Sequence, residues 1–156
     1  MTTVRVVDRS FDGEAEHFRA LHDPDTGLPK LALLRDRLDI ALAHANCRDN
    51  YVAVFHVSID RPTTGPGDHG QRVRAAAAAI IDAVGPADTV ARVGEFEFVV
   101  VCFDIAYEED TAPILERILS GLQRSSAAAS EIGVAFGRGA DPDDLLASAR
   151  HAAART

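Results

Sequence analysis

The segment YVAVFHVSI, residues 51–59, limits the fold more than any other part of this sequence. It is almost continuously apolar and rich in Val and aromatic residues, which is typical of a β-strand buried on both faces. His56 lies inside the segment, and we expect a core residue with satisfied polar atoms rather than a metal ligand. The order of the elements that follow this strand decides the fold class.

From residue 51 onward the predicted order is β-α-β-β-α-β, followed by one further helix. The first six elements are those of a ferredoxin-like, split βαβ arrangement. An extra helix precedes the first strand, and the last helix is expected to pack on an edge or a face of the sheet. The predicted fold class is therefore α/β in the α+β sense, a ferredoxin-like βαββαβ core with extra N-terminal and C-terminal helices. The segments behind this prediction are strands in 51–59, 89–103 and 130–136 and helices in 31–45, 71–84, 108–124 and 141–154.

The parts of the chain outside these elements are predicted as turns, a loop and a short N-terminal segment. Residues 23–29 and 60–70 are rich in Asp, Pro and Gly, which favours a turn and a loop. Residues 12–22 form a short amphipathic pattern, and TVRVV before them is either a short strand or a tail. No linker or internal boundary interrupts the pattern, so one domain is expected.

Composition excludes several classes of function. The net charge of −8 argues against a general nucleic-acid surface, and no segment suits a membrane span or a signal peptide, so we expect a cytoplasmic protein without membrane or nucleic-acid partners. Two cysteines do not form a disulfide framework, and Cys102 is expected to be a buried small hydrophobe. The six histidines are scattered without a metal-binding spacing. No metal site and no cofactor are predicted.

The segment ARVGEFEFVVV, residues 91–101, is predicted to be a β-hairpin. Gly94 at the first central position suits a two-residue type II′ turn. With that turn, Val93 faces Phe96 and Arg92 faces Glu97, so an opposite-charge pair forms across the strands.

Four stretches in the same order resemble the GGDEF domain, the nucleotidyl-cyclase-like domain of diguanylate cyclases. They are DPDTGLPKLALLRDRL, VFHVSIDR, ADTVARVGEFEFVVV and EIGVAF with the following DPDDLLASARHA. The resemblance covers about residues 22–155. It implies a GGDEF fold over residues 22–156, with residues 1–21 as a tail or short helix.

The signature positions of this sequence differ from those that the resemblance would require for catalysis. Active members use metal ions held by carboxylates to transfer a phosphoryl group. The metal-binding Asp corresponds to Ser58, the acidic third letter to Phe96 and the second Gly to Glu95, whose charge would repel phosphates. Gly94, Glu97 and Phe98 keep their family letters, but Glu97 alone makes a poor metal site.

Other positions of the family pattern also differ. The inhibitory-site motif R-x-x-D would place its Arg at Gly85 and its Asp at Asp88, so only the Asp remains. The guanine-reading loop is shortened, with His69-Gly70 or Asp68 at its closing position, and the chain stops before the C-terminal Lys. The resemblance also implies a contact between Arg92 and Asp23, which we expect to be structural.

Three functions are consistent with these residues. The first is a catalytically inactive GGDEF protein that acts in cyclic di-GMP signalling through contacts with itself, another GGDEF protein or another signalling enzyme. The second is a sensor that binds GTP or cyclic di-GMP without turnover. The third, an active cyclase with an altered site, is disfavoured by Ser58, Glu95 and Phe96.

Overall fold

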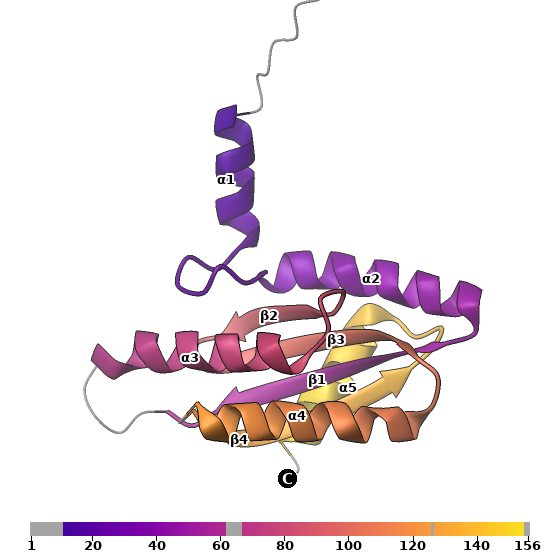
Figure 1. Cartoon of the computed structure of the whole chain (residues 1–156). Helices are drawn as coiled ribbons and strands as arrows, with labels where there is room; N and C mark the ends of the chain where they lie inside the picture. The colour runs from indigo at the N-terminus through magenta and orange to yellow at the C-terminus, as the bar shows by residue number, and fades with distance from the viewer. Residues whose placement is uncertain (1–10, 62–66, 126, 155–156) are drawn as a thin grey trace, which may run out of the picture.

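Strand β1, Tyr51–Ile59, lies inside a four-stranded sheet of order β2-β3-β1-β4, in which all neighbouring strands are antiparallel. The computed structural model describes residues 11–61, 67–125 and 127–154. Figure 1 shows the helices and strands. Their bounds are α1 Phe11–Leu21, α2 Leu31–Arg48, α3 Gly67–Ala83, β2 Thr89–Gly94, β3 Glu97–Ile105, the 3₁₀ turn η1 Glu108–Asp110, α4 Thr111–Arg124, β4 Ala129–Gly137 and α5 Pro142–Ala153. The predicted ferredoxin-like order is confirmed.

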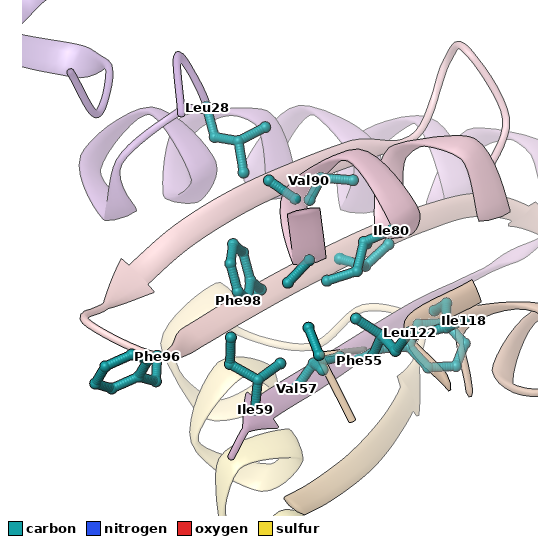
Figure 2. Packing of buried hydrophobic residues seen from close by; sticks show 14 of the residues in the cluster. Leu28, Phe55, Val57, Ile59, Ile80, Val90, Phe96, Phe98, Ile118 and Leu122 are labelled. Atoms are coloured by element: carbon teal, nitrogen blue, oxygen red, sulfur yellow. The ribbon is translucent and has the colours of Figure 1, made fainter. Parts of the chain in front are cut away.

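Helices cover both faces of the sheet, which explains the continuous apolar run of β1. Phe55 and Val57 belong to the core that α3 and α4 close with Ile80 and Ile118. Figure 2 shows these residues within one cluster. The alternate β1 residues, Val52 and Val54, belong to a second core with Leu34, Leu38, Leu145 and Ala149 of α2 and α5. The last helix therefore packs on a face of the sheet, one of the two predicted places.

Helix α5 is fixed at its start and along its length by two local features. The side chain of Asp141 accepts hydrogen bonds from the backbone N–H groups of Asp143 and Asp144, and Pro142 follows at the first helical position. In β4, a methyl group at Gly133 would collide with backbone atoms of Ala149 and Ala153. Glycine is therefore required for α5 to lie this close to the sheet.

The N-terminal part of the described chain is a helix that stands away from the sheet (Figure 1). At its end the rings of Phe18 and His22 stack with 3.8 Å between their centroids. His22 then pairs with Pro29 in an isolated β-bridge, which closes the turn between α1 and α2. The short strand or tail predicted for TVRVV lies outside the described residues.

The predicted loop over 60–70 was wrong at its C-terminal end, because α3 begins at Gly67. The Gly and Asp residues there indicated a loop by composition, but they form the first turn of the helix. Within the described ranges, no helix is long and apolar enough to cross a membrane.

Candidate functional site

Strands β2 and β3 form a hairpin that contains residues 94–98, and we call it the signature hairpin. Its turn lies at Glu95 and Phe96, one residue later than predicted. Gly94 pairs with Glu97, and Arg92 pairs with Phe98, with a register shift between the two pairs. The predicted register, with Arg92 opposite Glu97 and Val93 opposite Phe96, was therefore wrong. Among the described glycines only Gly27 and Gly139 have positive φ, so Gly94 does not form the type II′ turn that was expected.

Arg92, in β2, stabilises the turn at Glu95 and Phe96 with its side chain. Its Nε donates to the carbonyl oxygen of Gly94 at 3.2 Å, and its Nη2 donates to that of Glu95 at 2.9 Å. Its Nη1 lies 3.1 Å from carboxylate oxygens of both Asp23 and Asp25. The contact with Asp23 is the one that the resemblance implies. Sequence reasoning missed the contact with Asp25, since the two residues are far apart along the chain.

Asp23 organises the turn that precedes α2 and connects it to the hairpin. Its carboxylate accepts hydrogen bonds from the backbone N–H of Thr26 at 2.9 Å and from the Thr26 hydroxyl at 2.7 Å. Burial raises the pKa of Asp23, but the hydrogen bonds from Thr26 and Arg92 outweigh burial and hold the pKa below its ordinary value. The backbone N–H of Arg92 also bonds the carbonyl of Pro29 at 3.1 Å. The turn and β2 thus form one hydrogen-bonded unit.

Phe96, at the third signature position, is packed into the core rather than exposed at the turn. Its side chain is 6% exposed and belongs to the cluster closed by α3 and α4. Figure 2 shows it at the tip of the hairpin, at one end of this cluster. The ring of His69 meets it edge-on at 5.4 Å, and the Arg61 guanidinium lies 5.6 Å from its centroid. This burial was not predicted from the sequence, although an aromatic residue in a turn is a signal for it.

Ser58 stands at the position that the resemblance aligns with the metal-binding Asp of active members. Ser58 lies opposite Glu97 on one side and Glu131 on the other, and its carbonyl accepts a hydrogen bond from the Ser130 hydroxyl at 3.1 Å. No group of three His, Cys, Asp or Glu residues suited to a metal ion occurs in the described ranges. The hydroxyl at position 58 and the phenyl ring at position 96 offer no carboxylate to a metal ion.

Exposed Glu95 places a negative charge at the tip of the same hairpin. Its side chain is 63% exposed, and one carboxylate oxygen lies 4.0 Å from Nδ1 of His69. The two signature residues that differ from the family pattern thus point in opposite directions, the Phe96 side chain into the core and the Glu95 side chain toward solvent.

Gly85 and Asp88 form a tight turn between α3 and β2. The Asp88 carboxylate accepts a hydrogen bond from the backbone N–H of Gly85 at 2.9 Å, and the backbone N–H of Asp88 bonds the Gly85 carbonyl at 3.1 Å. Burial, and to a lesser extent Asp88, raise the pKa of the nearby Cys102 thiol, so this buried thiol stays protonated. The Asp88 carboxylate thus bonds the backbone of Gly85. Among the described residues, no charged side chain forms an ion pair with Asp88.

Comparisons with known proteins agree with this fold. The GGDEF domain of TpbB (YfiN) from Pseudomonas aeruginosa is 29% identical, with a TM-score of 0.74 over 86% of this chain and 87% of that one. SiaD from the same organism, solved with its activator SiaC, is 21% identical with a TM-score of 0.77, and the match covers 92% of this chain and 60% of SiaD. The DgcB GGDEF domain from Caulobacter crescentus, solved with cyclic di-GMP, is 23% identical with a TM-score of 0.72 over 87% of this chain and 89% of that one.

No curated protein sequence matches the chain. The profile of the family described as "Diguanylate cyclase, GGDEF domain" matches residues 20–156, which is most of the chain. This match and the mixed α/β fold shared with solved GGDEF structures together identify the family. The chain belongs to the GGDEF domain family of cyclic di-GMP signalling.

Proposed function

We propose that this chain is a catalytically inactive GGDEF protein that acts in cyclic di-GMP signalling through contacts with other proteins. The observation that carries the proposal is the burial of Phe96, which is 6% exposed at the signature position where the family has an acid. We also propose that residues 22–156 form the GGDEF domain and residues 1–21 a separate N-terminal segment. A cytoplasmic location stays a prediction.

The chemistry of phosphoryl transfer supports inactivity. Metal ions neutralise the charge that develops on the transferred group and are worth several kcal/mol of transition-state stabilisation. Neither Ser58 nor Phe96 offers a carboxylate for them, and Glu95 adds a negative charge where phosphates would approach. The surviving acid, Glu97, has no second carboxylate at these two positions to share a metal with.

The direct test is incubation of the pure protein with GTP and Mg²⁺ or Mn²⁺, with an active diguanylate cyclase measured beside it. We expect no cyclic di-GMP above background. Turnover that is abolished in Glu97→Ala would show an active enzyme and contradict the proposal.

The part of the proposal that concerns partners is supported by a related case. SiaD is a diguanylate cyclase whose solved complex contains a protein activator, SiaC. We expect a pull-down from the native cell to recover proteins with cyclase or phosphodiesterase domains, with bare resin as the control. Recovery of no such protein above the control would contradict this part.

Calorimetry with GTP and cyclic di-GMP in the presence of Mg²⁺ separates inactivity from nucleotide sensing. Because Gly85 cannot supply the Arg of the inhibitory-site motif and Glu95 is unfavourable to phosphates, we expect no heat of binding. Saturable binding of either nucleotide would favour the sensor instead.

A further inference from the structure

A cavity of about 310 Å³ lies between α2, α5 and the sheet, beside the signature hairpin. Its apolar wall combines Val93 and Val99 of the strands with Leu31 and Leu146 of the two helices. This volume lies at the lower end of the range for small-molecule sites. The cavity is therefore large enough for a small metabolite and small for a nucleotide.

His56 lines this cavity from β1 and has a buried polar atom without a partner. The residue is 5% exposed, and its Nδ1 has no hydrogen-bond partner in the described part of the chain. His56 is therefore a core residue, as expected, but the expectation that its polar atoms are satisfied was wrong. A buried polar atom left unpaired costs about 1–3 kcal/mol, and this atom lies beneath the surface of the cavity, out of contact with solvent.

Two opposite charges also line the cavity without meeting. Glu97 lies on the strand side and Arg150 on α5, and neither has an ion-pair partner within 4.0 Å among the described residues. The other two charged side chains at the cavity, Arg35 and Asp143, satisfy each other at 2.7 Å. One cation and one anion therefore remain for a ligand.

The imidazole of His56 forms an uncharged part of the cavity wall. Burial lowers its pKa most strongly, Arg150 lowers it further, and Glu97 and Glu131 act in the opposite direction, with the pKa ending below its ordinary value. At neutral pH the imidazole therefore adds no charge to the cavity.

We propose that this cavity binds a small zwitterion with an apolar side chain, of the α-amino acid class. Its carboxylate pairs with Arg150, and its ammonium group donates to Glu97. Its side chain covers Val99 and Leu146. A triphosphate does not suit the site, because the two arginines and two acids that line it sum to no net charge. The proposal does not depend on whether the chain has cyclase activity.

The experiment is isothermal calorimetry of the whole chain with L-leucine as the probe and three matched ligands. L-Leucinamide lacks the carboxylate, N-acetyl-L-leucine lacks the ammonium group and glycine lacks the apolar side chain. We expect saturable binding of leucine with a Kd on the order of 1 mM or tighter, and about tenfold weaker binding of each of the other three. The side-chain ¹⁵N signal of His56 is expected to shift as leucine is added.

Variants test the same contacts from the side of the protein. Arg150→Gln and Glu97→Gln are each expected to weaken leucine binding by about tenfold or more. Arg124→Gln, on an exposed position of α4 across the sheet, is expected to bind leucine as the wild type does. Absence of saturable binding for leucine, valine and phenylalanine up to about 10 mM would overturn the proposal. Binding that is unchanged in Arg150→Gln, or equal for leucine and leucinamide, would overturn it too.

Discussion

Arg92 is the residue on which the signature hairpin depends. Its side chain is 13% exposed and bonds two carbonyls of the turn and the carboxylates of Asp23 and Asp25. Asp23 is nearly as buried, at 14%. Loss of the guanidinium would leave a largely buried carboxylate without its cation, which is the costly way to break an ion pair.

We expect Arg92→Ala to lower the free energy of unfolding by about 2–4 kcal/mol. Arg35→Ala is the matched control, because the Arg35–Asp143 pair is more than half exposed on both sides and is worth about 0–1 kcal/mol. Urea denaturation of both variants beside the wild type measures the difference. Equal losses would show that the Arg92 network adds no stability of its own.

His56 makes the stability of the protein depend on pH. Because its pKa is lowered in the folded state, the unfolded chain binds the proton more readily. Its contribution is therefore complete above its ordinary pKa of 6.5 and is lost as the pH falls below that value. The groups that face it are Glu97, Glu131 and Arg150, of which the two acids oppose the effect of burial.

We expect the free energy of unfolding to fall between about pH 7.5 and 5.5, and His56→Leu to reduce this slope. His151→Leu, at an exposed position of α5, is the control and is expected to keep the slope. Urea titrations at several pH values give the measurement. A His56→Leu variant with the wild-type slope would assign the pH dependence to other groups.

At the scale of elements, the hairpin shows how packing overrides a local turn preference. Gly94 favoured a type II′ turn, but that turn would have set Phe96 in a strand opposite Val93. Moving the turn by one residue buries Phe96, which is worth about 1.5–3 kcal/mol. It also brings two turn carbonyls within reach of Arg92. These gains come from residues distant in sequence, so local pattern alone could not predict them.

The packing of α5 on β4 depends on a single glycine. We expect Gly133→Ala to destabilise the protein by roughly 3 kcal/mol, because its methyl group would collide with the backbone of α5 near Ala149 and Ala153. Gly70→Ala is the control: its methyl group would meet only the flexible end of Arg74, and alanine favours the helix. Thermal unfolding of both variants tests this. A tolerated Gly133→Ala would mean that α5 can shift at little cost.

At the scale of the whole molecule, the chain has the sheet and helices of its family, and Phe96 of the signature packs into the core. Both faces of the sheet are covered, and Phe96 extends one of the two cores to the tip of the hairpin. Replacing Phe96 by the acid of the family signature would therefore add a carboxylate and lower the free energy of unfolding.

We expect Phe96→Asp to destabilise the protein by about 3 kcal/mol, because a charge replaces a buried ring. Tyr107→Ala, at a position that is 68% exposed, is expected to change stability by less than about 0.5 kcal/mol.

The triple variant Ser58→Asp, Glu95→Gly and Phe96→Asp is expected to make no cyclic di-GMP, because the guanine-reading loop is still shortened. Denaturation curves and a GTP turnover assay provide the readouts, and product from the triple variant would mean that these three positions alone hold the activity back.

Much of the fold followed from the sequence because its elements have strong local signals. The run 51–59 predicted β1 to the residue, and Asp141-Pro142 predicted the start of α5. The order of strands and helices then left the ferredoxin-like sheet as the expected topology. The family motifs lie on these elements, so the assignment to the GGDEF family was also within reach of the sequence.

The sequence by itself determined the fold and the family, because these depend on periodicity, caps and short motifs. Only the tertiary structure decided the position of the turn, the place of Phe96 in the core and the contact of Arg92 with Asp25. It also decided that Glu97, Arg150 and His56 share one cavity. Each of these depends on side chains that are distant in the sequence and meet only when α2, α5 and the hairpin pack on the same sheet.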